Sequence, residues 1–427
     1  MPTLAASPVE LDRSALRLRY LNNRNRSSEL FSIFEPSAYE TRPIPLRHPP
    51  VFYEGHIPAF GYRKLLREGL GAPFIDERLE VLFARGIDPA SLDDAKRHQR
   101  EEWPARSVVQ AFGAECDAAI LRALATADLT DERSPVLVRG QAAFTILEHE
   151  EMHHETFMYL MHRLPLERKR RRASGSAFAE GAPFASGRVA IPAGRATLGA
   201  RRDVVEFGWD NEFDEHAVDV AAFEIDVNNV TNGEWLAFLG EGGPLPPFWL
   251  ERDGAYRLLT QFEELALPLS WPVYVTQTQA AAYAAWRGAR LPSEAEYHRA
   301  AFGTPDGSER AFPWGNDPPD ARRHGNFDFR RYDPEPVGSS PAGASAWGVA
   351  DLIGNGWEWT STEFAPFGGF TPLASYPEYS ADFFDGAHFI IKGASPVTNR
   401  HHIRRSFRNW YRSDYPYAYA AFRTVSD

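Results

Sequence analysis

Hydrophobic side chains recur every three or four residues through the first third of the chain. This spacing puts apolar side chains on one face of a helix, and such helices bury those faces against one another. The segments with this spacing are residues 10–34, 56–70, 76–86, 107–127 and 141–164. The pattern predicts a bundle of about four helices over residues 1–168.

The pattern changes once, after a short basic stretch. The run Lys169 to Arg172 is followed by small residues, so residues 169–188 are predicted to be an exposed linker. Beyond the linker, short runs predict strands at 188–194, 195–200 and 216–231 and helices at 233–239, 276–288 and 293–303. We therefore expect an α+β protein whose second domain, residues 189–427, is irregular and rich in loops.

The composition limits the kinds of protein that this chain can be. Its 427 residues, 43% of them hydrophobic, suffice for two or three domains with their own cores. A net charge of -12 argues against a nucleic-acid or acidic-membrane partner. The single cysteine, Cys116, excludes an intrachain disulfide and fits a reducing compartment. Without a signal-peptide pattern or a run of about 18 apolar residues, we expect a cytoplasmic protein with no membrane span.

The segment 141–164 carries the strongest candidate for chemistry. His149 and His153 lie four residues apart in a stretch without proline or glycine, so both project from one face of a helix. Two imidazoles in that geometry can bind one metal ion. Glu151 and Glu155 are candidate acceptors that would hold a ligand imidazole through its other N–H. A solvated pair of histidines, and a solvated acidic face, are the alternatives.

The second domain resembles a known family. Eight short motifs occur in the family's order: 191–199, 207–216, 230–239, 289–301, 312–316, 347–362, 390–395 and 420–425. Together they resemble the formylglycine-generating-enzyme-like (sulfatase-modifying factor) domain, and FGWDNE from Phe207 resembles the version found in ergothioneine-type sulfoxide synthases. True formylglycine-generating enzymes bind copper through cysteines near the C-terminus of this domain. Residues 395–423 contain no cysteine, so oxidation of a sulfatase cysteine by that chemistry is excluded.

The resemblance extends to the first domain and implies a metal site. In the sulfoxide synthases a DinB-like four-helix bundle precedes the second domain, and both domains line the active site. That bundle carries HxxxHxE, matched by His149, His153 and Glu155, and an upstream histidine, matched by His56. The resemblance implies three histidine ligands to iron(II), with open positions for substrates and O2. The ligand set alone suits zinc equally well.

The resemblance also implies a substrate, hercynine, which is the trimethylated betaine of histidine. Its cation favours aromatic faces and carboxylate oxygens. The family's betaine pocket is matched by Asn409 and Trp410, and it is extended here by Tyr411, Asp414 and Tyr417. An ordinary aromatic core is the alternative reading of these rings. Met152 replaces a glutamine that touches hercynine in some relatives.

Two departures from the family bear on the sulfur or selenium donor. Phe367 lies about where several relatives have a tyrosine that donates a proton, and phenylalanine cannot donate. Tyr411 and Tyr415, with Tyr417, are therefore the candidate catalytic residues. The arginine pair that holds gamma-glutamylcysteine in one branch has no clear match, since Arg100 and Arg106 stand in a different context. These departures favour the related selenoneine synthases, which use a selenosugar.

The sequence supports three hypotheses from different classes. The first is an iron- and O2-dependent synthase that joins selenium or sulfur to C2 of hercynine, using a selenosugar or, as the alternative, cysteine or gamma-glutamylcysteine. The second is a zinc-dependent thiol transferase, because other DinB-like bundles use three histidines with zinc or nickel. The third is a non-catalytic binding module. A monomer and a homodimer are both open.

Overall fold

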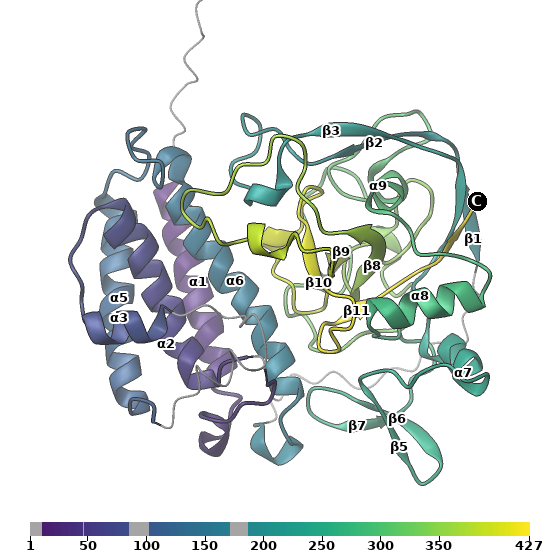
Figure 1. Cartoon of the computed structure of the whole chain (residues 1–427), viewed down its shortest axis with the longest axis horizontal. Helices are drawn as coiled ribbons and strands as arrows, with labels where there is room; N and C mark the ends of the chain where they lie inside the picture. The colour runs from purple at the N-terminus through teal and green to yellow at the C-terminus, as the bar shows by residue number, and fades with distance from the viewer. Residues whose placement is uncertain (1–10, 46, 85–101, 171–186) are drawn as a thin grey trace, which may run out of the picture. The chain divides into compact units, whose positions relative to one another are not determined.

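The computed structural model describes residues 11–45, 47–84, 102–170 and 187–427 (Figure 1). The chain forms two compact units. The helical unit comprises Met1–Arg172 together with Leu373–Pro377, and the mixed unit comprises Ala173–Pro372 together with Glu378–Asp427. Most of the predicted linker, residues 171–186, lies outside the described residues. The segment Leu373–Pro377 belongs with the helical unit although its sequence neighbours on both sides belong to the mixed unit.

The helical unit is a bundle. Its helices are α1 (Arg13–Phe31), α2 (Pro50–Gly61), α3 (Glu77–Phe83), α5 (Arg106–Thr126) and α6 (Gln141–His162). A π-helical segment, η2 (Tyr62–Gly69), continues α2. Helices α1 and α2 each pack against both α5 and α6, and α3 packs against α2. The predicted helical first domain is therefore confirmed, and the described part of it contains five α-helices where about four were expected. They are labelled in Figure 1.

Charged side chains inside this bundle are paired rather than solvated. Glu150 is buried and accepts hydrogen bonds from Arg24 (2.7 Å) and from Ser27 (2.6 Å). A buried carboxylate persists only when its charge is compensated in this way. Lys169, which we expected at the start of an exposed linker, is buried instead, because it pairs in a β-bridge with Phe34. Among the described residues, no helix is both long enough and apolar enough to cross a membrane.

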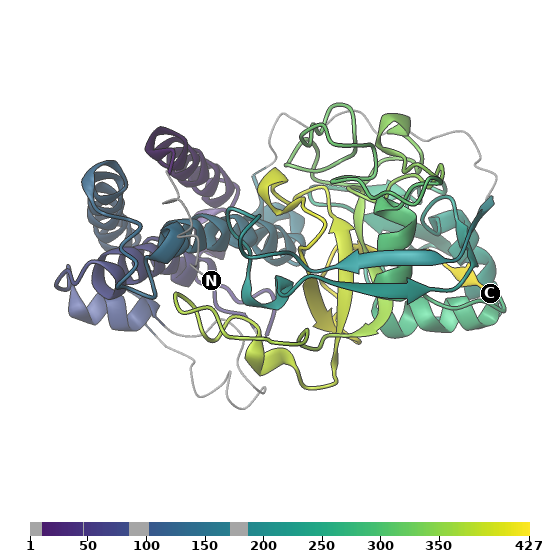
Figure 2. The same cartoon turned by 90° about the horizontal axis from the view of Figure 1, so that it is seen from above.

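The mixed unit contains several small sheets rather than one large one. Its strands are β1 (Arg188–Ile191), β2 (Gly194–Leu198), β3 (His216–Val220), β4 (Phe223–Asp226), β5 (Trp249–Arg252), β6 (Ala255–Leu259), β7 (Glu264–Ala266), β8 (Gly356–Glu363), β9 (His388–Ala394), β10 (Asn409–Arg412), β11 (Ala420–Ala421) and β12 (Val425–Ser426). The orders are β1-β4-β12, β10-β9-β8-β11, β2-β3 and β5-β6-β7. The long β2–β3 hairpin is clearest in Figure 2. The predicted strands before residue 231 are confirmed, whereas β5–β7 and β8–β10 were not predicted.

Three short helices start where the sequence predicts them. They are α7 (Asn232–Gly240), α8 (Gln277–Trp286) and α9 (Glu294–Phe302). Each begins with a reciprocal capping box, and the one at Ser293 and Glu296 was predicted from their spacing. Helix α9 packs against β2, β3, β8 and β9, so its first residue, Glu294, lies beside the central four-stranded sheet.

Candidate metal centre

Three histidines of the helical unit converge on one point. His56 comes from α2, and His149 and His153 come from successive turns of α6. One ring nitrogen of each lies within 4.8 Å of the others, and the Nε2 atoms of His149 and His153 are 3.2 Å apart. All three side chains are buried. Among the described residues this is the one group of three or more histidine, cysteine or acidic side chains with metal-ligand spacing.

The protonation of these imidazoles fits a metal site. The Nδ1 of His56 lies 2.7 Å from the carbonyl oxygen of Phe83, and because a carbonyl can only accept, this nitrogen carries the proton. The Nε2 of His56 is then a free lone pair, and it has no hydrogen-bond partner among the described residues. Burial lowers the pKa of His56 to about 4. Burial, and then the neighbouring imidazoles, lower the pKa of His149 and of His153 well below 6.5.

Three neutral imidazoles whose ring nitrogens converge can bind a divalent transition metal. The alternative of a solvated histidine pair is wrong, because His149 and His153 are almost fully buried. Three ligands on one side of an ion leave its other positions open. The donor set accommodates iron(II), and it accommodates zinc equally well.

The contacts that orient these ligands differ from those expected. The sequence offered Glu151 and Glu155 as acceptors for a ligand imidazole. Glu151 accepts two hydrogen bonds from Arg19 (2.8 and 2.6 Å), and Glu155 accepts one from Tyr159 (2.6 Å). Both carboxylates are buried, so a solvated face is wrong for both. The Nδ1 of His149 has no partner among the described residues, and a role for Glu155 at another ligand stays a prediction.

Aromatic rings surround the ligands. The ring of Phe60 stacks on His149, with centroids 3.6 Å apart and planes 11° apart. Tyr53 lies beside His153 with a centroid distance of 5.4 Å. Tyr376, from the segment Leu373–Pro377, meets His149 edge-on at 6.0 Å. Since Tyr53 is fully buried whereas Tyr376 is partly exposed, Tyr376 is the phenol that a ligand can reach.

The position of Tyr376 is fixed by its neighbour in sequence. The hydroxyl of Ser375 lies 2.7 Å from that of Thr145 on α6, and both residues are buried. The Ser375 amide also donates to the side-chain oxygen of Gln141 at 3.3 Å. Sequence reasoning missed Tyr376, because it lies in an irregular segment without periodicity. Its one signal was a tyrosine followed by a proline in the same loop as Phe367.

Comparisons with known proteins show the family to which the chain belongs. A family model described as "Sulfatase-modifying factor enzyme 1-like domain" matches residues 176–427. The chain is 33% identical over 429 residues to "Hercynine oxygenase" of Mycolicibacterium thermoresistibile, covering 93% of this chain and 91% of that protein. The chain belongs to the hercynine oxygenase family of ergothioneine-type sulfoxide synthases. The resemblance found in the sequence is confirmed.

Two further relatives match over most of this chain as well. A "Hercynine oxygenase" of Mycolicibacterium smegmatis is 35% identical over 331 residues, covering 70% of this chain and 73% of that protein. "Ergothioneine biosynthesis protein 1" of Schizosaccharomyces pombe is 28% identical over 426 residues, covering 90% of this chain and 52% of that protein. Membership of the sulfoxide synthase family thus includes the helical unit, although its DinB-like character stays a prediction.

The residues predicted to bind hercynine include two aromatic groups in the mixed unit. Trp410 stacks on Phe364, with centroids 4.1 Å apart and planes 8° apart. Tyr411 stacks on Tyr415 at 4.7 Å, and Tyr417 meets Tyr415 edge-on at 5.1 Å. Asn409 and Trp410 begin β10 and are partly buried, whereas Asp414 is exposed, and Met152 on α6 is partly exposed. Their roles toward hercynine stay predictions.

Phe367 belongs to a packed cluster in this unit. Its ring lies 3.9 Å from the guanidinium carbon of Arg408 and meets His216 edge-on at 4.5 Å. A tyrosine at this position would contact these side chains too. Phe367 therefore contributes packing around Arg408, and whether it also touches a substrate stays a prediction.

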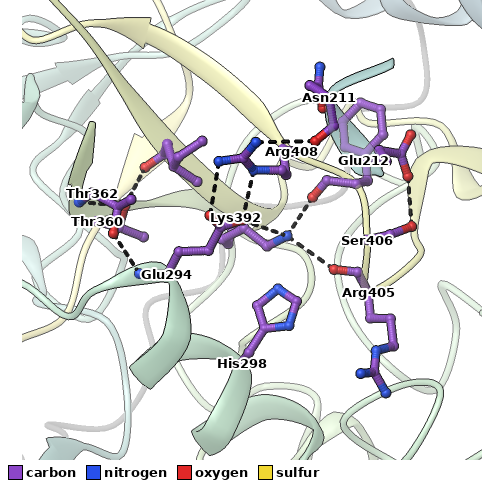
Figure 3. Close-up of polar contacts among 12 residues, drawn as sticks. Asn211, Glu212, Glu294, His298, Thr360, Thr362, Lys392, Arg405, Ser406 and Arg408 are labelled. Carbon is purple, nitrogen blue, oxygen red and sulfur yellow. Dashed lines mark hydrogen bonds and ion pairs between the residues drawn. The ribbon is translucent and has the colours of Figure 1, made fainter. Parts of the chain in front are cut away.

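The chain just before Asn409 is held by a buried ionic network (Figure 3). Arg408 is fully enclosed and forms a bidentate pair with Glu294, at 3.1 and 3.2 Å. The same guanidinium donates to the carbonyl oxygens of Asn211 (3.1 Å) and Ala365 (3.0 Å). The planar guanidinium of Arg408 thus connects the start of α9, the FGWDNE motif and the segment before Phe367.

A second part of this network holds the segment 404–407. The carboxylate of Glu212, the last residue of FGWDNE, accepts hydrogen bonds from Arg404 (2.6 and 2.8 Å) and from Ser406 (2.7 Å). The ammonium of Lys392 lies 3.8 Å from Glu294 and donates to the Arg405 carbonyl oxygen at 3.1 Å, as Figure 3 shows. Burial lowers the pKa of Lys392 to about 8. The FGWDNE motif therefore has a structural role: its Glu212 holds the segment that leads into β10.

Proposed function

We propose that this chain is an iron(II)- and O2-dependent synthase that joins sulfur or selenium to C2 of the imidazole of hercynine. The observation that carries the proposal is the buried group of three neutral histidines in a chain related to hercynine oxygenases. With a thiol donor the overall reaction balances as hercynine C2–H plus R–S–H plus O2, giving the C2 sulfoxide and water. Bound iron(II) would supply the open positions for substrate and O2 that this chemistry needs.

We further propose that Tyr376 holds the proton used in this reaction. Its contact with His149, and the anchoring of Ser375 beside it, support this role. The family's proton-donating tyrosine was expected at Tyr411 or Tyr415, because Phe367 stands where several relatives have it. Those two tyrosines stack on each other in the mixed unit, so their rings already serve a packing role. General acid catalysis by a positioned phenol contributes about 10²-fold or more to a rate.

The choice between donors depends on whether this chain has free cations for the carboxylates of gamma-glutamylcysteine. Of the two arginines considered for holding gamma-glutamylcysteine, Arg100 lies outside the described residues. Arg106 is engaged by Glu54, with hydrogen bonds of 3.0 and 2.9 Å. This supports a donor with few carboxylates, and we propose a selenosugar, with cysteine as the alternative. Phe367 no longer bears on the choice of donor, because Tyr376 provides a phenol beside His149.

A donor panel tests the proposal. Anaerobic protein loaded with iron(II) is mixed with hercynine and one donor, opened to air, and its products are identified by mass. The donors are a selenosugar, the matching thiosugar, cysteine and gamma-glutamylcysteine. We expect a hercynine adduct with the selenosugar and little with gamma-glutamylcysteine. Rapid adduct formation with gamma-glutamylcysteine alone would overturn the donor assignment, and no adduct with any donor would overturn the function.

A zinc-dependent thiol transferase is the second candidate, because three histidines suit zinc as well as iron. Such an enzyme moves a thiol without consuming O2. Metal analysis of the purified protein, combined with product formation under nitrogen, separates the two candidates. A product that forms at the same rate under nitrogen with zinc alone would favour the transferase.

A further inference from the structure

A buried lysine lies at the edge of the three-histidine site. His56, Phe60 and Lys64 follow one another at intervals of four residues along α2 and its π-helical continuation, so they share one face. Lys64 has only 4% of its surface exposed. Short π-helical segments occur frequently at functional sites. The same spacing that brings His56 to the metal site therefore brings a cation two turns further along the helix.

The surroundings of Lys64 connect it to the ligands. Its Nζ lies 5.7 Å from the centroid of the Phe60 ring and 5.4 Å from that of Tyr376. These are the two rings that contact His149, one stacked at 3.6 Å and one edge-on at 6.0 Å. The ammonium is thus close enough to influence the metal site electrostatically.

The ammonium has spare hydrogen-bonding capacity. It carries three N–H donors, and one of them is used by Glu68 at 3.0 Å. Within the described part of the chain no other acceptor is found for Lys64. Glu68 is itself exposed, and it is shared with the partly exposed Arg63 at 2.7 Å. Burying an ammonium is unfavourable unless it is well paired. Because Glu68 is shared with Arg63 and partly solvated, it compensates the charge of Lys64 only weakly.

We propose that Lys64 binds a substrate carboxylate at the edge of the metal site. This inference rests on the proposed function, which supplies two carboxylate sources: hercynine itself, and a cysteine-type donor. Aromatic rings on either side would place the carboxylate in a partly dry environment, where a charge-assisted hydrogen bond is strongest. Met152, which replaces a family glutamine, removes one polar contact to hercynine, and Lys64 provides another. Because a selenosugar carries no carboxylate, hercynine is the source that agrees with the proposed donor.

Paired ligands that differ only in the carboxylate test this role. Anaerobic iron(II)-loaded protein is titrated with hercynine and with its decarboxylated analogue, and binding is followed by calorimetry. Hercynine-saturated protein is then titrated with cysteine and with cysteamine. The variants are Lys64→Met, which keeps the length and removes the charge, and Lys64→Arg, which keeps the charge. Arg63→Met is the matched control, since it removes the neighbouring, partly exposed cation that also pairs with Glu68.

The wild type should bind hercynine about 10- to 100-fold more tightly than the analogue, as charge-assisted hydrogen bonds allow. Lys64→Met should abolish that preference without weakening the analogue, whereas Lys64→Arg and Arg63→Met should retain it. A loss confined to the cysteine–cysteamine ratio would assign the same carboxylate contact to the donor. If Lys64→Met changes neither the hercynine-to-analogue nor the cysteine-to-cysteamine affinity ratio, Lys64 has only a structural role and the inference is overturned. A wild type that binds neither hercynine nor its analogue would instead refute the proposed function.

Discussion

The ring of Tyr376 meets the imidazole of His149 edge-on, with centroids 6.0 Å apart and an angle of 75° between the planes. The two residues are 227 positions apart in sequence, and Ser375 secures the contact through its hydrogen bond with Thr145. Tyr376 belongs with the helical unit, beside the metal ligands, and it lies in the same loop as Phe367. This relationship changes which tyrosine is expected to act in catalysis.

Replacing Tyr376 by phenylalanine should slow formation of the hercynine adduct by about 10²-fold, because the site loses its reachable phenol. With a thiol donor, the product should shift from the adduct toward plain oxidation of the thiol. Mass analysis of both products, at equal iron content, measures the effect. Tyr53→Phe is the matched control, since Tyr53 also lies beside a ligand but is fully buried. If Tyr411→Phe or Tyr415→Phe shows the shift and Tyr376→Phe does not, the sequence-based assignment is restored.

Removing either helix ligand should abolish metal binding. His149→Ala and His153→Ala each leave two imidazoles, and we expect iron content to fall to background while the protein stays folded. His154→Gln is the control, because that ring is not one of the three converging histidines and lies 2.9 Å from the hydroxyl of Ser27 on α1. Iron content and circular dichroism measured on the same samples give the comparison. Full metal occupancy in His149→Ala would contradict the site.

The metal-free protein should lose stability as the pH falls from about 6.5 to about 4. The folded pKa of His56 is about 4 and those of His149 and His153 are well below 6.5, so the unfolded chain binds protons first. The free energy of unfolding should then fall by about 1.4 kcal/mol per pH unit for each such histidine. Urea titrations across this range measure it. The double variant His149→Gln with His153→Gln should show a clearly smaller slope, and an unchanged slope would refute the explanation.

The network around Arg408 should matter for substrate binding more than for turnover. Arg408→Lys keeps the charge but loses the planar fork that reaches Glu294 and two carbonyl oxygens. We expect the KM for hercynine to rise about 10-fold, with kcat nearly unchanged, because the chain leading into Asn409 and Trp410 is less well held. Arg405→Lys is the control, since Arg405 pairs with Glu309 instead. Equal kinetics in both variants would show that Arg408 has no positioning role.

Much of the fold follows from local patterns in the sequence. The apolar spacing located the bundle helices, and the capping residues located the start of α9 at Glu294. The i, i+4 spacing of His149 and His153 suggested a shared metal ion, and the resemblance to the sulfoxide synthases supported that interpretation and added His56. Strands β8 and β9 were missed because most of their residues are buried on both faces and include tryptophan, glycine and charged residues, so they lack alternation. Trp357 and Trp359, for example, are both fully buried in β8.

What the sequence could not provide is contact between distant segments. The proton position on His56 depends on the carbonyl of Phe83, and any residue type at 83 would supply that atom. Tyr376 reaches His149 through an irregular segment that no periodicity identifies. Lys64 was readable in principle from its spacing after His56 and Phe60, but a lysine in a helix is usually solvated. Its burial became evident only in the folded structure.

Oxygen uptake by the iron(II)-loaded protein tests most directly whether this chain joins a sulfur or selenium donor to hercynine with O2 as the oxidant. The protein is supplied with hercynine and a donor that forms the adduct, and O2 consumption and adduct formation are recorded together. We expect about one O2 consumed per adduct, as the balanced equation requires, and no sustained uptake when hercynine is omitted or when His149→Ala replaces the wild type. Adduct formation without O2 consumption, or uptake that is the same with and without hercynine, would contradict the proposed function.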